Sequence, residues 1–225
     1  MGIGENIINL RQSLGDLPVK IVAVSKTHPV EMIKEAYETG QRLFGENKVQ
    51  ELVTKYEELI DYDIKWHLIG HLQTNKVKYI AEFVDLIHSV DSLKLLKEIN
   101  KQAEKNNRVI NCLFQFYIAK EETKFGLDLE ESKEILNSLD YKEMKNIRIC
   151  GVMGMASFTD NMDLLRKEFR NLKQIFEQLK KDYFATSPDF CELSMGMSSD
   201  WKIAVAEGST LIRVGSNIFG TRIYI

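Results

Sequence analysis

Val19-Lys20-Ile21-Val22-Ala23-Val24-Ser25 is a short run of mostly apolar, β-branched residues, and a segment long enough for a helix follows it. The same alternation of a short apolar run and a helical segment recurs along the chain. It predicts eight strands, over residues 19–25, 42–45, 65–69, 84–89, 109–117, 147–153, 190–195 and 211–214. Strands that are apolar on both faces and joined by helical crossovers form parallel sheets covered by helices. Eight such units predict a closed (β/α)8 TIM barrel, with an open doubly wound sheet as the alternative.

The crossover between the sixth and seventh predicted strands shows the helical spacing most clearly. Its apolar residues recur at intervals of three and four, which places them on one helix face: Met162, Leu165, Phe169, Leu172, Phe176 and Leu179. A further helix over residues 3–14 is expected before the first strand, against the floor or side of the barrel. The chain has three prolines and no Gly/Ser-rich linker, so we expect residues 1–225 to form a single domain.

Composition excludes several classes of protein. The 225 residues include 33 acidic and 30 basic side chains, which give a net charge of -3. This balance argues against a polybasic nucleic-acid binder. No apolar run approaches the roughly 18 residues that cross a bilayer, and the first residues lack the apolar core of a signal peptide. We therefore expect a cytoplasmic protein without a nucleic-acid or membrane partner.

The cysteines and histidines do not form a metal-binding pattern. Cys112, Cys150 and Cys191 are odd in number, far apart and each within an apolar stretch, so we expect three buried thiols and no disulfide framework. The histidines show no ligand spacing of the HExxH kind. No metal is predicted, and His67, on a predicted strand, is expected to be a hydrogen-bonded core residue.

Functional groups of a barrel collect at the carboxyl ends of its strands, and Lys26 closes the first of them. Burial at the barrel mouth would lower the pKa of its amine and expose a neutral nucleophile. A neutral amine is what a Schiff base with a carbonyl compound requires. The alternative is a lysine that extends out of the barrel into solvent.

Two further strand ends carry small polar residues. Gly196 would turn the chain after strand seven, and Ser198 follows it with a hydroxyl at the start of a helix expected over residues 201–207. Gly215 and Ser216 follow strand eight. The loops after strands seven and eight are the recurrent phosphate position of TIM barrels. The alternative is simple helix capping by Ser198 with support from Asp200, whose charge would repel phosphate unless it points away.

Strand eight of a closed barrel pairs with strand one, so an amine and a phosphate site would lie side by side. This arrangement suits a phosphorylated aldehyde, either pyridoxal 5′-phosphate (PLP) or a sugar phosphate of a Schiff-base aldolase. Arg213 lies on the same side of its strand as Gly215. A guanidinium cannot accept a hydrogen bond, so opposite a pyridine nitrogen it would keep that nitrogen unprotonated. An aldolase has no need of such a group, and Arg213 therefore favours PLP.

Several stretches resemble the pyridoxal phosphate homeostasis protein family, whose members are similar to the barrel domain of alanine racemase. They are Ala23-Val24-Ser25-Lys26, Phe44-Gly45-Glu46-Asn47-Lys48-Val49-Gln50-Glu51, Trp66-His67-Leu68-Ile69-Gly70-His71-Leu72-Gln73-Thr74-Asn75-Lys76 and Phe219-Gly220-Thr221-Arg222. The third is the most specific, with Leu68 where Phe or Met is usual. Lys124-Phe125-Gly126 also matches, whereas Phe116-Tyr117 replaces the usual Val-Asn.

The resemblance implies a set of residues that hold PLP: Lys26, Asn47, Ser198, Arg213, Gly215 and Ser216. Lys26 would carry PLP as a Schiff base, and Arg213 would face the ring nitrogen. Ser198, Gly215 and Ser216 would hold the phosphate, and Asn47 would lie near the ring. The departure at Phe116-Tyr117 leaves strand five without an assigned role.

Racemisation through PLP needs a proton donor on each face of the substrate α-carbon. Lys26 could serve one face. In alanine racemase a tyrosine from a second domain of the partner subunit serves the other, and here only residues 216–225 follow strand eight. We therefore expect a non-enzymatic protein that stores, protects or delivers PLP, possible recipients being apo forms of PLP-dependent enzymes. A single-domain amino-acid racemase is the alternative and a PLP-free aldolase the third choice; a monomer is expected, with a dimer left open.

Overall fold

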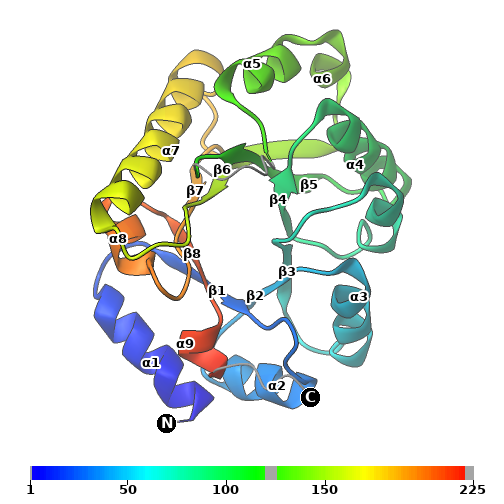
Figure 1. Cartoon of the computed structure of the whole chain (residues 1–225). Helices are drawn as coiled ribbons and strands as arrows, with labels where there is room; N and C mark the ends of the chain where they lie inside the picture. Colours follow the sequence, from blue (N-terminus) through cyan, green and yellow to red (C-terminus); the bar gives the residue numbers. More distant parts are fainter. Residues whose placement is uncertain (1, 120–125, 221–225) are drawn as a thin grey trace.

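The eight predicted strands close into one parallel barrel in the computed structural model, which describes residues 2–119 and 126–220 (Figure 1). Hydrogen bonding runs in order from the first strand to the last and returns to the first. The strands are β1 (Lys20–Val24), β2 (Leu43–Glu46), β3 (Lys65–Leu68), β4 (Leu86–Val90), β5 (Ile110–Tyr117), β6 (Ile147–Met155), β7 (Glu192–Ser194) and β8 (Leu211–Val214). The predicted TIM barrel is therefore confirmed.

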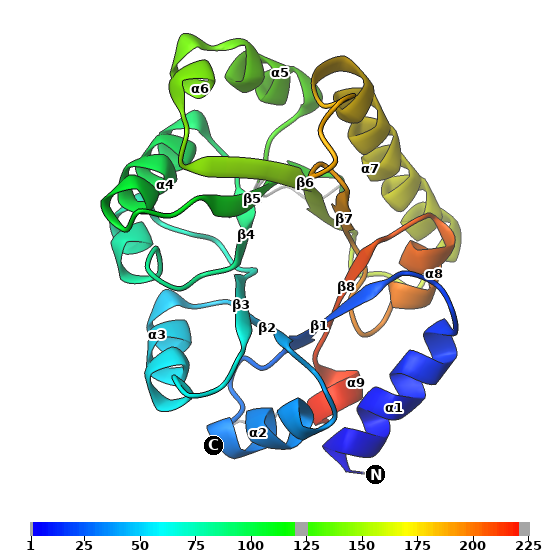
Figure 2. The same ribbon diagram turned by 180° about the vertical axis from the view of Figure 1, so that it is seen from behind.

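Helices surround this barrel on its outside (Figures 1 and 2). They are α1 (Ile3–Leu14), α2 (Val30–Glu38), α3 (Val49–Glu58), α4 (Leu93–Lys105), α5 (Leu129–Asn137), α6 (Leu139–Glu143), α7 (Met162–Tyr183), α8 (Trp201–Ala206) and α9 (Ser216–Phe219), with the 3-10 helix η1 (Thr74–Tyr79) between β3 and β4. The expected first helix is α1, which packs against α2 and α9 on the outer wall (Figure 2).

Strand seven is shorter than its apolar run. The prediction covers residues 190–195, whereas β7 ends at Ser194 and begins at Glu192. Its pairing with β8 is limited to Ser194 opposite Leu211, and the Thr210 hydroxyl accepts the amide of Leu193 at 2.8 Å. A side chain thus takes one place of the backbone ladder, which sequence periodicity does not reveal.

Strand alternation gives the protein two apolar cores. The larger one fills the space between the sheet and the helices. The smaller one lies inside the barrel and consists of Val22, Leu86, Leu113, Cys150, Met153 and Leu211. Polar side chains also point into the interior, among them Arg213, which is 4% exposed. The barrel lumen is therefore a packed core with a polar portion.

Cys112 and Cys150 are buried as expected, but Cys191 is exposed, so the prediction is wrong there. Cys191 precedes β7 at the amino-terminal end of the barrel, where its apolar neighbours pack and its own side chain faces outward. Burial raises the pKa of the Cys150 thiol to about 11. Among the described residues, none of the helices has the length and apolarity needed to span a bilayer.

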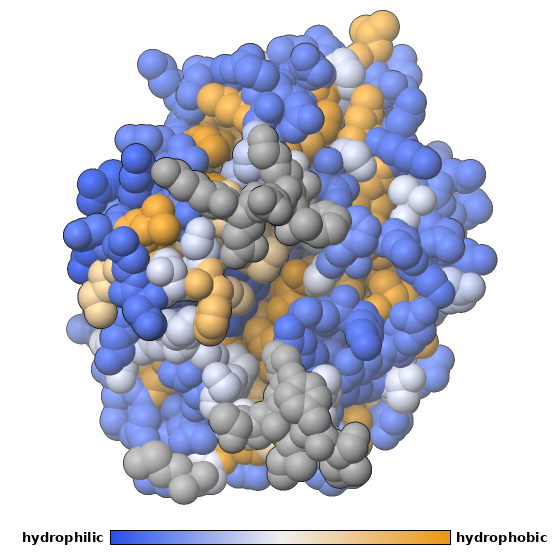
Figure 3. Space-filling view, viewed as in Figure 1, coloured by the Kyte–Doolittle hydropathy of each residue, from blue (hydrophilic) through white to orange (hydrophobic). Residues whose placement is uncertain are grey.

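The face seen in Figure 3 carries apolar side chains near its centre, around the mouth of the barrel. Met155 and Phe158, which line the cavity at this mouth, are 44% and 92% exposed. Two stretches that carried the family resemblance extend past the described part of the chain, since Lys124, Phe125, Thr221 and Arg222 lie outside it.

Candidate functional site

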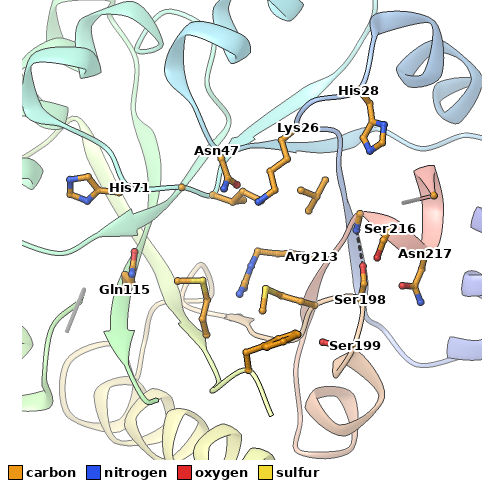
Figure 4. Close-up of a pocket in the computed structure, with 18 residues that line it drawn as sticks. Lys26, His28, Asn47, His71, Gln115, Ser198, Ser199, Arg213, Ser216 and Asn217 are labelled. Carbon is orange, nitrogen blue, oxygen red and sulfur yellow. Dashed lines mark hydrogen bonds between the residues drawn. The ribbon is translucent and has the colours of Figure 1, made fainter. Parts of the chain in front are cut away.

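A cavity of about 860 Å³ opens at the carboxyl ends of the strands (Figure 4). All of the residues predicted to bind a cofactor line it: Lys26, Asn47, Ser198, Arg213, Gly215 and Ser216. They come from β1, β2, β7 and β8 and the turns that follow these strands. The closed barrel thus brings the two ends of the chain to one site.

Lys26 is half-buried and points into the cavity (Figure 4). Its neighbours in the chain are fixed from behind. Lys55 Nζ donates a hydrogen bond to the carbonyl oxygen of Ser25 at 2.7 Å, and the Thr27 amide donates to Glu51 Oε1. Thr27 has a φ of 67°, in the left-handed region that residues other than glycine seldom adopt. These contacts hold the strained turn that directs the Lys26 side chain inward.

The group behind Lys26 is a buried ion cluster on the outer side of the sheet. Lys55 Nζ lies 2.7 Å from both Glu46 Oε1 and Glu51 Oε1. Ser25 Oγ donates to Glu46 Oε1 at 2.6 Å. Burial of Glu46 raises the pKa of its carboxyl group, against the opposing effect of the Lys55 ammonium. Sequence reasoning missed this cluster, although the spacing of Glu51 and Lys55 by four residues on one helix was a visible signal.

Ser198 joins the two loops predicted to hold a phosphate. Its hydroxyl accepts the amide of Gly215 at 3.1 Å (Figure 4). A Cβ on Gly215 would lie 3.2 Å from the Val24 carbonyl oxygen, so a side chain there would crowd the end of β1. Ser216 begins α9, and the first amides of a helix have no partner within it. Hydroxyl and amide donors therefore gather beside Lys26.

The capping alternative for Ser198 is wrong. Asp200, not Ser198, is the N-cap residue of α8, and no side-chain cap bond forms there. Asp200 is buried and accepts the amide of Met197, while its pKa is raised by burial. The observed helix ends at Ala206, one residue before the predicted end. The carboxylate is thus engaged with its own turn, because the tight bend at Gly196, with a φ of 95°, folds the chain back.

Arg213 lies at the base of the cavity on β8. Its Nη1 donates to Ser194 Oγ at 2.6 Å and its Nη2 to the Gly154 carbonyl oxygen at 3.1 Å. Burial lowers the pKa of the guanidinium to about 10, and the negative charge of Asp200 opposes this effect. Arg213 remains a cation at neutral pH, held so that its planar end faces the cavity.

Asn47 depends on a glycine that sequence reasoning did not select. A Cβ on Gly70 would lie 2.4 Å from the Asn47 carbonyl oxygen and 2.8 Å from its Cα. Both residues line the cavity, after β2 and β3 respectively. Only glycine lets these two strand ends approach so closely. Gly70 stands within the most specific stretch of the sequence, which was the signal available.

Other lining residues were not predicted. Gln115 reaches the cavity from β5, the strand whose role sequence reasoning left open. His28 stacks on Phe219 with ring centroids 5.0 Å apart. His71 lies on the opposite side of the cavity (Figure 4). Of the residues that line the cavity in the described part of the chain, none is a tyrosine or a cysteine.

His67 is a hydrogen-bonded core residue, as expected. It is 2% exposed, and its Nδ1 lies 3.0 Å from His88 Nε2 in the barrel interior. Within residues 2–119 and 126–220, no group of three or more His, Cys, Asp or Glu side chains is placed to hold a metal ion.

The family model described as the alanine racemase N-terminal domain matches residues 2–223. The pyridoxal phosphate homeostasis protein of Aquifex aeolicus is 42% identical over 215 residues, which are 95% of this chain and 92% of that protein. The protein of the same name from Escherichia coli is 37% identical and covers 92% of this chain and 87% of its own length.

Solved structures similar to this chain come from the same two groups of proteins. PipY of Synechococcus elongatus PCC7942, with PLP bound, has a TM-score of 0.85 and 37% identity, covering 97% of this chain and all of that one. Alanine racemase of Clostridium difficile 630 has a TM-score of 0.74 at 15% identity, covers 99% of this chain and 57% of its own, and shares the fold. This chain therefore belongs to the alanine racemase N-terminal domain family and, within it, to the pyridoxal phosphate homeostasis proteins.

Proposed function

We propose that this protein binds PLP in the cavity at the barrel mouth and takes part in PLP homeostasis within the cytoplasm, by storing, protecting or delivering the cofactor. The observation that carries the proposal is the meeting of three groups in one cavity: the Lys26 amine, the Arg213 guanidinium and the donors at the Ser198–Gly215 contact. The PLP-bound PipY structure and the names of the relatives support it.

The donor set fits the two ends of PLP. The phosphate would take hydroxyl and amide donors from Ser198 and Ser216 and, where it replaces Ser198 Oγ as the acceptor, from the Gly215 amide; these hydrogen bonds are charge-assisted because the acceptor is an anion. The pyridine nitrogen would face Arg213. A guanidinium carries only donors, so the nitrogen opposite it must accept and remains unprotonated. Asn47 would contact the ring from the end of β2.

Lys26 is the residue that would hold the cofactor covalently. PLP supplies an aldehyde carbon, to which an amine adds with loss of the oxygen as water. The ion cluster behind β1 positions the Lys26 backbone, and the half-buried side chain places its amine inside the cavity. The pKa lowering expected of this amine stays a prediction.

A carrier role is favoured over catalysis by the chemistry of the cavity wall. Racemisation needs proton donors on both faces of the substrate. Lys26 would serve one face, and the described lining residues include no tyrosine or cysteine for the other. An unprotonated ring nitrogen also makes PLP a weaker electron sink. Rapid conversion of L-alanine to D-alanine by the purified protein would instead favour a racemase.

The recipients of PLP would be apo forms of PLP-dependent enzymes, and the protein would act as a monomer. Transfer can be followed by mixing the loaded protein with an apo-enzyme and measuring the recovery of that enzyme's activity. The same mixture with Lys26→Ala protein and PLP at matched concentration separates transfer from simple release.

Replacement of Lys26 tests the covalent site. Lys26→Ala should abolish the yellow absorption of the PLP-loaded protein and the adduct trapped by borohydride, because no other amine is expected to reach the aldehyde. Lys48→Ala is the matched control: Lys48 is exposed, follows Asn47 directly and does not line the cavity. Mass spectrometry of the reduced wild-type protein should locate the adduct on Lys26. An adduct of equal yield in Lys26→Ala would contradict the assignment.

A further inference from the structure

A chain of polar side chains runs through the barrel interior from the cofactor site toward the opposite opening. Arg213 Nη1 lies 2.6 Å from Ser194 Oγ, and Ser194 Oγ lies 3.1 Å from His88 Nδ1. His88 Nε2 is 3.0 Å from His67 Nδ1, and His67 Nε2 is 3.5 Å from Asp85 Oδ2. The side chains come from β8, β7, β4 and β3 and the residue before β4. They connect the cavity at the mouth with a second cavity that His67 and Asp85 line.

The hydrogen bonds of this series all have the same donor-to-acceptor order, and this order follows from Arg213. A guanidinium can only donate, so Ser194 Oγ accepts from it. Ser194 is fully buried, and its own proton is satisfied if it goes to His88 Nδ1. His88 then carries its proton on Nε2 and donates to His67 Nδ1. His67 in turn carries its proton on Nε2, facing the carboxylate of Asp85.

The direction of these contacts places one proton on each imidazole. His88 is fully buried, and desolvation holds its pKa well below the usual value, with smaller electrostatic contributions from His67 and Arg213. The only formal charges of the chain therefore stand at its ends, a cation at Arg213 and an anion at Asp85. Asp85 is partly exposed, and its contact with His67 lowers the pKa of its carboxyl group.

We propose that Ser194, His88, His67 and Asp85 are positioning residues that orient Arg213 toward the pyridine nitrogen of PLP and keep it a hydrogen-bond donor. This role rests on the proposed PLP site. Without an acceptor at Ser194, the guanidinium can rotate away from the cavity. Without Asp85, His67 Nε2 has no carboxylate to face. The proposed donor-to-acceptor order of the hydrogen bonds is then less strongly favoured along the whole series, up to Arg213.

The direction can be measured on the protein without PLP. Long-range proton–nitrogen NMR spectra distinguish the tautomers of each imidazole at neutral pH, and His67→Gln and His88→Gln variants assign the signals. His88 and His67 should both be neutral and protonated on Nε2. A His88 protonated on Nδ1, or a charged His67, would overturn the proposed direction.

Ser194→Ala tests the role of the chain in PLP binding. The variant should bind PLP about tenfold more weakly, as for one lost hydrogen bond to a charged group, and the visible absorption band should shift. Ser89→Ala is the matched control, because Ser89 is equally buried, follows His88 on β4 and has no hydrogen-bond partner at Oγ in the described structure. Thermal unfolding without PLP verifies that both variants fold.

Asp85 gives a second test far from the cofactor. Asp85→Ala should weaken PLP binding about threefold, whereas Asp85→Asn, which retains an acceptor for His67, should stay within about twofold of wild type. Asp189→Ala is the control, since Asp189 lines the same second cavity but pairs with Arg148.

The outcomes separate the two proposals. Wild-type PLP binding together with unchanged affinity and spectrum in Ser194→Ala would overturn the positioning role alone. A wild-type protein that binds no PLP would contradict the proposed function, and the positioning role would fail with it. A weakened Ser194→Ala with unaffected Ser89→Ala and Asp189→Ala supports both.

Discussion

Two buried polar clusters of this protein lie next to the proposed site and are built differently: one contacts the residues that flank Lys26, and the other ends at Arg213. Outside the sheet, Lys55 binds two carboxylates, Glu46 and Glu51, behind Lys26. Inside the barrel, a serine and two histidines, Ser194, His88 and His67, connect Arg213 with Asp85. The outer cluster places two carboxylates around one ammonium. The inner chain keeps its charges at its ends.

This difference in the placement of charge determines what each cluster is expected to contribute to stability and to PLP binding. Lys55 and Glu46 are 7% and 0% exposed at their side chains, so either charge alone would be strongly destabilising. Glu46 Oε2 has no hydrogen-bond partner in the described structure, which adds to the cost of the ionised form. The inner chain leaves no such atom. We therefore expect the outer cluster to govern stability and the inner chain to govern the affinity for PLP.

Lys55→Met should have the largest effect on stability. It keeps the apolar stem of Lys55 but removes the ammonium, and it leaves a buried carboxylate at Glu46 without its partner. Breaking one side of a buried pair costs about 3–5 kcal/mol of unfolding free energy. Urea denaturation at neutral pH measures this loss.

The control for Lys55→Met is Lys173→Met, which breaks an exposed pair with Glu177 and should change stability by less than about 1 kcal/mol. Adding Glu46→Gln to Lys55→Met should recover part of the loss, because the stranded charge is removed. If Lys55→Met lowers the unfolding free energy by less than about 1 kcal/mol, the outer cluster is not the main support of the turn that follows β1.

His88→Leu breaks the inner chain and should cost less, about 1–3 kcal/mol. The leucine fills much of the same space, but the Ser194 proton and His67 Nδ1 lose their partner. The same denaturation series measures the effect, with Ser89→Ala as the control on the same strand. If His88→Leu destabilises the protein more than Lys55→Met does, the proposed division between the clusters is reversed.

Much of the site could be predicted because strand order and strand alternation determine it. Lys26, Arg213 and Gly215 face the mouth because they continue the inward positions of β1 and β8, and barrel closure makes these strands neighbours. The eight strands were predicted within a few residues for the same reason. β7 was too long in the prediction, because only residues 192–194 of its apolar run pair with β6 and only Ser194 pairs with β8.

The supporting contacts could not be predicted in this way. Whether Ser198 caps α8 or binds the Gly215 amide depends on the course of one turn. In the structure, Ser198 binds the Gly215 amide. The His67–His88 contact joins two strands through their side chains, and a sequence gives no distance between them. Cys191 is exposed despite its apolar neighbours, because the run containing it extends beyond the paired part of β7.

The pH dependence of stability should show the smallest effect and the sharpest contrast between the clusters. The folded-state pKa of Glu46 is raised above its ordinary value of 4.5, mainly by burial. A raised pKa means that the folded protein binds a proton that the unfolded chain releases. The stability from this group is therefore fully present below pH 4.5 and is lost as the pH rises through the folded-state pKa.

Glu46→Gln removes this titration. The unfolding free energy of the wild type, relative to that of Glu46→Gln, should fall as the pH rises from about 4 to 7. Glu38→Gln, at an exposed position of α2, should leave the wild-type profile unchanged. The unfolding free energy of the wild type, relative to that of His88→Leu, should instead rise with pH over this range, because burial lowers the folded-state pKa of His88 and the unfolded chain then binds a proton that the folded protein does not. A profile of Glu46→Gln parallel to that of the wild type would show that Lys55 compensates the buried carboxylate fully, and the two clusters would then not differ in the sign of their pH dependence in the expected way.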